Sequence, residues 1–360
     1  MSRDYNFSAG PAALPEEVLR EVQAELLEWG GARASVMEVS HRGKAFAAMA
    51  GEAEQDLREL LAVPDDYRVL FLQGGATQHF AQIAMNFARR DQAVDYVLTG
   101  DWSEKAAKEA AASACVRIAA SSAATNYDRV PPRATWDLDP GAAYVHVTPN
   151  ETIRGVEFHA VPEVGDVPLI GDVSSTILSR PLEVARYALL YAGAQKNIGP
   201  SGLVVMIVRE ELLQRCPKAL PRIFNYAEHA AAGSMLNTPN TWGWYLAGQV
   251  FKWLKRQGGV AAMGERNRAK AELLYGYIDG SGWYRNPVEP AARSWMNVPF
   301  TLPRAELDAV FLEEADAAGL MALKGHRAVG GMRASIYNAM PLAGVQALVD
   351  FMADFARRHG

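Results

Sequence analysis

The chain has 360 residues, of which 49% are hydrophobic and 21% charged, the composition of a folded globular protein. Asp and Glu (41) outnumber Lys and Arg (36), and the resulting formal charge of −5 excludes a broadly basic nucleic-acid binder. The two cysteines, Cys115 and Cys216, match neither a disulfide framework nor a zinc spacing. With no visible secretory signal and no apolar run of the roughly 18 residues that a membrane span needs, we expect a cytoplasmic protein without membrane contact.

Helical patterns and short apolar runs alternate up to about residue 250. In chain order they predict helices over 14–29 and 46–61, a strand over 69–72, a helix from about 78, a strand over 96–98, a helix over 103–112, and strands over 144–147, 168–170, 188–191 and 203–208. Apolar strands that alternate with helices are typical of a mostly parallel α/β sheet. This part, residues 16–259, is the expected large domain.

The pattern changes after this point. It predicts a helix over 259–278, a strand over 297–300, a helix over 304–318, a strand over 332–336 and a closing helix over 342–358. We expect residues 260–360 to form a smaller α+β domain.

A lysine between two predicted strands carries the densest chemical signal. Lys196 lies in a run of small residues and glycines from Tyr191 to Gly202. In apolar surroundings a charged amine is costly, so its pKa should fall and the amine should become a nucleophile, as Schiff-base chemistry requires. Taken alone, such a lysine is more often a surface turn residue.

Further polar or glycine-containing segments follow other predicted strands. Asp172 ends a buried strand, where a carboxylate could pair with a pyridinium nitrogen or simply cap a turn. The segment Gln73–Thr77 opens a helix, whose N-terminus favours a phosphate, although Gly-Gly turns are common. Trp102 could stack on a flat ring or pack in the core, and Thr152 could donate to a ring hydroxyl.

As a set, these segments resemble the phosphoserine aminotransferase family, which belongs to the type I enzymes that use pyridoxal 5′-phosphate (PLP). The resemblance covers nearly the whole chain, and the segment around Lys196 is highly specific. The other matching segments are Asn6-Phe7 with Gly10-Pro11, Val36–Lys44, Ser234–Pro239 and Gly330–Pro341. It implies the type I PLP transferase fold, with a seven-stranded type of sheet and with residues 1–15 as an N-terminal segment near the active site.

The resemblance also implies a role for each matching residue. Lys196 would hold PLP and move the α-proton, Asp172 would pair with the ring nitrogen, and Trp102 would stack on the ring. Thr152 would bond the phenolic oxygen. The phosphate would be held by Ala76, Thr77 and Gln195, and by Asn237 and Thr238 from the other subunit of a homodimer.

Cations for an anionic substrate come from two His-Arg pairs and one further arginine. Arginine suits bidentate capture of a carboxylate. The resemblance implies that Arg333 grips the α-carboxylate, and that the pairs His41-Arg42 and His326-Arg327 line the phosphate end, one of them donated across the dimer. Arg42 is also a candidate for the side-chain carboxylate of glutamate. Without the family, each pair reads as a solvated surface feature, and no histidine has metal-ligand spacing.

We therefore expect reversible ping-pong transfer of an amino group from L-glutamate to 3-phosphohydroxypyruvate, giving O-phospho-L-serine and 2-oxoglutarate. This reaction belongs to serine biosynthesis, and a phosphohydroxythreonine of pyridoxal phosphate biosynthesis is a further candidate substrate. Two alternatives stay open: an alanine–glyoxylate or serine–pyruvate type of aminotransferase, which would not need the His-Arg pairs, and a non-catalytic relative that only binds PLP.

Overall fold

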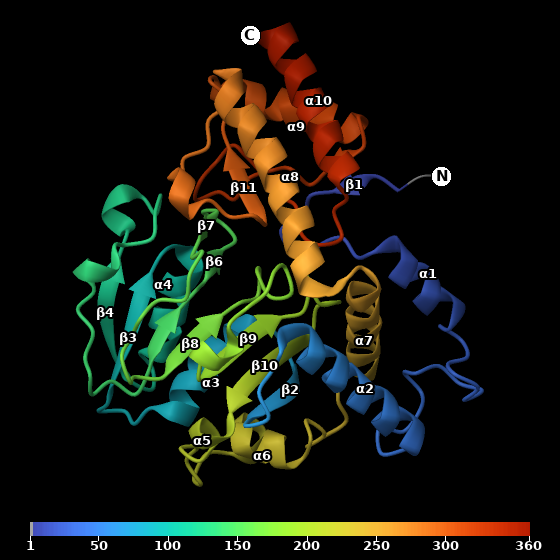
Figure 1. The fold of residues 1–360 in the computed structure, drawn as a ribbon, viewed down its shortest axis with the longest axis vertical. Coiled ribbons are helices and arrows are strands. Elements are labelled where there is room, and N and C mark those ends of the chain that lie inside the picture. Colours follow the sequence, from blue (N-terminus) through green and yellow to red (C-terminus); the bar gives the residue numbers. More distant parts are fainter. Residues whose placement is uncertain (1–2) are drawn as a thin grey trace.

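A computed structural model describes residues 3–360, and its centre is a seven-stranded sheet (Figure 1). From edge to edge the strands are β2 (Tyr67–Gln73), β10 (Leu203–Arg209), β9 (Leu189–Gly193), β8 (Leu169–Asp172), β5 (Val145–Val147), β3 (Ala93–Leu98) and β4 (Cys115–Ser121). Only β10 runs antiparallel to its neighbours in this sheet, and the other adjacent pairs are parallel. The prediction of a mostly parallel α/β sheet is confirmed.

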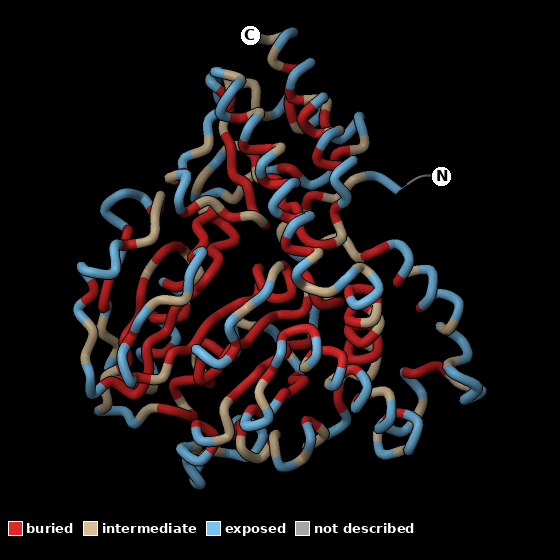
Figure 2. The backbone as a smooth tube through the Cα atoms, in the orientation of Figure 1, coloured by how far each residue is buried: buried red, intermediate tan, exposed pale blue. Residues whose placement is uncertain are grey.

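Helices cover both faces of this sheet, so its strands are buried along most of their length (Figure 2). Successive residues of β10 alternate between two cores: Val204 and Met206 join one core, whereas Val205 and Ile207 join the other. The helices α2 (Lys44–Leu61) and α7 (Thr241–Arg256) pack on one side, and α3 (Ala76–Phe87) and α4 (Asp101–Ala110) on the other. Burial on both faces explains the uninterrupted apolar runs of the sequence.

The last hundred residues surround a third core. Its elements are α8 (Gly259–Ser281), β11 (Asn297–Phe300), α9 (Asp308–Ala317), β12 (Leu320–Met321), β13 (Met332–Ser335) and α10 (Leu342–His359). Strands β11 and β13 are antiparallel, while β1 (Tyr5–Asn6) pairs in parallel with β12, so the N-terminal segment joins this part of the chain. The division into domains at residues 15 and 259 stays a prediction.

Short elements complete the chain. They are α1 (Glu16–Ala24), the hairpin strands β6 (Asn150–Glu151) and β7 (Val156–Glu157), α5 (Glu210–Leu213), α6 (Tyr226–Ala231), and the 3₁₀ turns Ala123–Thr125, Arg133–Thr135, Val184–Arg186, Arg222–Phe224, Pro290–Ala292 and Ala305–Leu307. Within residues 3–360, no helix combines the length and the hydropathy required to cross a bilayer.

Several predicted boundaries were wrong, and some elements were missed. The first helix ends at Ala24 and not near 29, and Leu27 beyond its end is 86% exposed. The helix predicted from 304 starts at Asp308, after a 3₁₀ turn. Strand β4 escaped prediction because this edge strand has exposed residues on part of its length. Helix α7 also escaped prediction; its sequence contains two glycines and several bulky aromatic residues, which are weaker helix formers.

Candidate active site

A cavity of about 340 Å³ lies where the central sheet meets the C-terminal part of the chain. Chain segments that follow strands of the parallel sheet contribute most of its wall, as expected for an α/β sheet. Nine residues singled out from the sequence line it: Ala76, Thr77, Trp102, Thr152, Asp172, Gln195, Lys196, His326 and Arg333. Ala9 and Gly10 of the N-terminal segment line it as well. Segments far apart in the sequence therefore share one site.

Lys196 follows β9 and is buried, with 9% of its surface exposed. Its Nζ donates a hydrogen bond of 2.7 Å to Oγ1 of Thr152. Burial lowers the pKa of Lys196 to about 8, although the charges of Asp172 and Glu151 oppose this shift. Arg333 adds a smaller contribution in the same direction as burial. The amine can therefore lose its proton near neutral pH and act as a nucleophile.

Asp172 is the last residue of β8 and is buried at the cavity wall. Oδ1 accepts bonds from the backbone N–H (3.0 Å) and the hydroxyl (2.6 Å) of Ser174. Burial raises the pKa of Asp172, and the bonds from Ser174 and the charge of Lys196 act against that rise. Oδ2 has no hydrogen-bond partner among residues 3–360, so this atom can accept a proton donor from a ligand.

The start of α3 forms another part of the wall. Gly74 has φ of 103°, a conformation that favours glycine, and a Cβ there would lie 2.6 Å from Oε1 of Gln78. Gly75 precedes the helix and offers no side-chain cap, so the first N–H groups of α3, at Ala76 and Thr77, can bind an anion. Gln195 lies nearby in the cavity wall.

Trp102 and two cations line the same cavity. The Trp102 ring packs beside Phe80, at 6.4 Å between centroids, and Nζ of Lys105 lies 4.2 Å from its centroid. Arg333 comes from β13, and its Nη1 donates to the Thr152 carbonyl at 3.3 Å, while its buried Nε has no partner in the described chain. Burial lowers the pKa of His326. The cavity thus has a positive end.

Five of the predicted residues do not line this cavity: His41, Arg42, Asn237, Thr238 and Arg327. Asn237 instead lines a separate hollow of about 400 Å³, together with Gln73 and Gly74. The Thr238 carbonyl accepts a bond of 2.5 Å from Nε2 of Gln73. A single chain therefore does not bring these residues together with Lys196.

The sequence reasoning missed several residues of the wall. Ser174 and Ser175 lie two and three positions after Asp172, and their place after a strand end was a usable signal. Lys105 lies one helical turn after Trp102, so helical periodicity placed it on the same face. Nδ2 of Asn150 donates to Oγ of Ser175 at 2.8 Å, a contact between β6 and the segment after β8 that no local pattern indicates.

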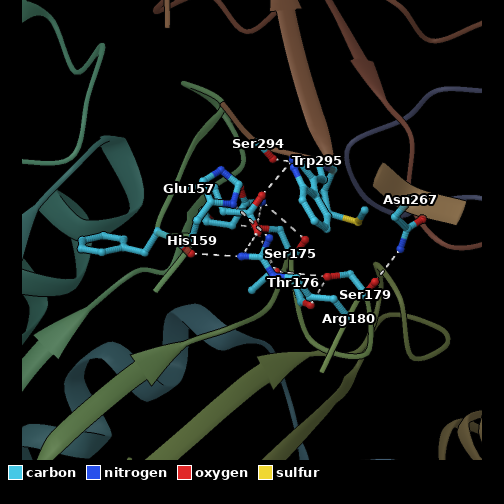
Figure 3. Close-up of polar contacts among 12 residues, drawn as sticks. Glu157, His159, Ser175, Thr176, Ser179, Arg180, Asn267, Ser294 and Trp295 are labelled. Carbon is cyan, nitrogen blue, oxygen red and sulfur yellow. Dashed lines mark hydrogen bonds and ion pairs between the residues drawn. The ribbon is translucent and has the colours of Figure 1, made fainter. Parts of the chain in front are cut away.

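An ion pair between β7 and the segment after β8 lies against the residues that precede β11 (Figure 3). Nη2 of Arg180 lies 2.7 Å from Oε1 of Glu157, which is 1% exposed. Oε2 of Glu157 accepts a bond of 2.8 Å from the Trp295 backbone N–H, and the Arg180 guanidinium lies 4.8 Å from the Trp295 ring centroid. The segment after Asp172 is thereby held against the residues that precede β11.

Known proteins resemble this chain over its full length. The sequence model of the family "Aminotransferase class-V" matches residues 4–348. A phosphoserine aminotransferase of Stenotrophomonas maltophilia (strain R551-3) is 61% identical over 361 residues, which are 100% of both chains. The structure of a phosphoserine aminotransferase from Bacillus circulans subsp. alkalophilus superposes with a TM-score of 0.98 at 48% identity and 99% coverage of both chains. A PLP-bound phosphoserine aminotransferase from Trichomonas vaginalis has a TM-score of 0.93 at 41% identity, covering 98% of this chain and 100% of its own.

Proposed function

The chain belongs to the class V aminotransferase family, and from this membership we propose that it is a PLP-dependent phosphoserine aminotransferase. It transfers an amino group reversibly from L-glutamate to 3-phosphohydroxypyruvate and releases O-phospho-L-serine and 2-oxoglutarate. The observation that carries this proposal is the meeting of a buried lysine of lowered pKa with a buried aspartate in one cavity. The full-length similarity to enzymes of that name supports the choice of substrates.

The residues of the cavity fit PLP. When bound, PLP supplies an aldehyde that reacts with amines and a pyridinium ring that withdraws electrons from the substrate. Oδ2 of Asp172 is available for the ring N–H, and the start of α3 at Ala76 and Thr77 is available for the phosphate. Trp102 offers a flat face for the ring, Thr152 a hydroxyl for the phenolic oxygen, and Gln195 a further amide for the phosphate.

Lys196 carries out the proton transfers. Its Nζ would hold the cofactor at the aldehyde, would be freed when the amino donor takes its place, and could then take the proton from the substrate α-carbon. An amine with a pKa near 8 can take and return that proton near neutral pH. Oδ2 of Asp172 would accept the ring N–H, and an ionised Asp172 would favour the protonated form of the ring nitrogen. The reverse sequence with the keto acid completes a ping-pong cycle.

The cations select the substrate. Nη2 of Arg333 makes no hydrogen bond in the described chain and is available for the α-carboxylate, whereas Nη1 bonds to the Thr152 carbonyl and Nε is buried without a partner. His326 lines the cavity on the same side, and Arg327 follows it in the chain. The charges of Lys105 and Arg327 both act on His326, and this positive charge favours a substrate with a second anionic group. The substrates of an alanine–glyoxylate type of reaction would still pair with Arg333 but would leave the remaining positive charge without a partner.

We further propose that the enzyme is a cytoplasmic homodimer with shared active sites. His41 and Arg42, together with Asn237 and Thr238, would complete the cavity of the neighbouring subunit, because within one chain they lie outside it. Mixing the inactive variants Lys196→Ala and Asn237→Ala tests this. Subunit exchange should restore activity, since one site of each mixed dimer combines intact Lys196 with intact Asn237. No recovery despite proven exchange would refute the shared site.

The proposed activity is tested by the visible spectrum of the purified protein. We expect an absorption band of bound PLP that bleaches with O-phospho-L-serine and responds poorly to L-serine or L-alanine. Equal responses to the three amino acids would move the substrate to small neutral amino acids. A bound cofactor that responds to no amino donor would indicate a non-catalytic relative, and absence of a band after addition of PLP would refute the proposal.

A further inference from the structure

A buried carboxylate without a cationic partner stands beside the cavity. The side chain of Glu151, in β6, is 0% exposed, and no Lys, Arg or His of residues 3–360 forms an ion pair with it. Oε2 accepts a bond of 3.1 Å from the backbone N–H of Trp102. Oε1 accepts bonds from the backbone N–H (2.8 Å) and the hydroxyl (2.7 Å) of Ser103. Burial raises the pKa of Glu151 to about 7, so this arrangement is costly.

Glu151 replaces a helix cap that the local sequence lacks. Helix α4 begins after Gly100, which has no side chain to bind the N–H groups of the first turn. A Cβ at Gly100 would lie 2.5 Å from Cδ of Glu151, so the carboxylate occupies the place of a normal cap. Serine at position 100 could bind the same N–H groups without burying a charge. Unlike a cap from residue 100, the cap from Glu151 also fixes the position of α4 relative to the β6–β7 hairpin.

This connection joins two residues of the cofactor cavity. Trp102 stands in the first turn of α4, and Thr152 follows Glu151 directly and accepts the bond from Lys196 Nζ. The Trp102 ring centroid lies 5.9 Å from the same Nζ. The buried indole Nε1 of Trp102 has no partner in the part of the chain that the structure describes, so the backbone and packing alone place the ring.

We propose that Glu151 is a positioning residue of the PLP site, which holds the Trp102 ring at a set separation from Thr152 and Lys196. This inference rests on the proposed function, because it assigns Trp102 and Thr152 to opposite parts of the cofactor. Glu151 does not line the cavity: it acts through the start of α4, and its charge also raises the pKa of Lys196.

The test separates capping from positioning. Glu151→Ala removes the cap and the connection together, whereas the double variant Gly100→Ser/Glu151→Ala restores a cap from within the helix. For each purified protein we would measure the thermal midpoint, the dissociation constant of PLP from the apoprotein, the circular dichroism of the bound-cofactor band, and kcat with KM for phosphoserine.

The double variant should regain most of the thermal stability that the single variant loses. Its dichroic band should stay altered, its PLP dissociation constant should stay raised, and its kcat should stay on the order of 10- to 100-fold below the parent, because small misplacements have such effects. KM for phosphoserine should change less than kcat. If the Glu151→Ala chain fails to fold, the double variant alone carries the comparison with the parent protein.

Glu104→Gln is the matched control. Glu104 stands in the same first turn of α4 and accepts a bond from Tyr127, so this change also removes a negative charge there but leaves the hairpin connection intact. It should keep the parent band and kcat. Recovery of the band, the dissociation constant and kcat by the double variant would overturn the proposal and leave Glu151 a helix cap. A parent protein that binds no PLP would refute the proposed function itself, and this inference with it.

Discussion

The lowered pKa of Lys196 makes a quantitative prediction about how the apoprotein captures PLP. Only the unprotonated amine attacks the aldehyde. With a pKa of about 8 in place of 10.5, about a quarter of the molecules carry a free amine at pH 7.5, against about one in a thousand for an ordinary lysine. The free amine is therefore a few hundred times more abundant at that pH. Because the unprotonated fraction rises with pH, the capture rate should rise through pH 8 and then level off.

The assay is stopped-flow absorbance of apoprotein mixed with PLP across the pH range. Each rate is divided by the rate for Nα-acetyl-lysine at the same pH, corrected for the known ionisation of that amine, so that the ionisations of PLP itself cancel. We expect the corrected capture rate to reach half of its plateau value, the midpoint, near pH 8. If the corrected rate reached half of its plateau only near pH 10.5, the pKa of an ordinary lysine, burial would not lower the pKa of Lys196.

Two variants should move this midpoint in opposite directions. The charge of Asp172 raises the pKa of Lys196, so Asp172→Asn should shift the midpoint to lower pH. The charge of Arg333 lowers that pKa, so Arg333→Met should shift the midpoint to higher pH. Shifts of the same sign would show that the variants act by changing the shape of the cavity and not by their charge.

Three further variants test the site and its support. Arg333→Met should raise KM for glutamate and for phosphoserine by roughly 10- to 100-fold, because a hydrogen bond to a charged group contributes about that much to binding. Unchanged KM values in steady-state kinetics would contradict the role of this arginine. Thr152→Val should weaken PLP binding by about 1 kcal/mol, while Thr152→Ser should not, and equilibrium dialysis can compare them. Glu157→Gln should lower the free energy of unfolding in urea by about 2 kcal/mol, less than for a fully buried pair because Arg180 keeps 20% of its side chain exposed. Unchanged stability would show that the pair of Figure 3 is dispensable.

The sequence by itself determined most strands of the central sheet and several of the functional residues that follow them. Strands buried on both faces must be continuous apolar runs, so β8, β9 and β10 were recognisable from composition. Asp172 and Lys196 follow such strands, and parallel strands bring their carboxyl ends to one edge. The strand end predicted that Asp172 faces a crevice, the family resemblance joined Lys196 to it, and both residues line the same cavity.

The tertiary structure decided everything that depends on contacts between distant segments. No local pattern indicates that Glu151 caps a helix that starts at Asp101, because the two are some fifty residues apart in the chain. The carboxylate also fits there only because residue 100 is a glycine. Helix α7 carries bulky residues on several sides because it packs against α1, α2 and α8. The bond from Arg333 to the Thr152 carbonyl likewise exists only because the C-terminal part packs over the sheet. Periodicity encodes which face of an element is buried, but the partner that buries it is set by packing of the whole chain.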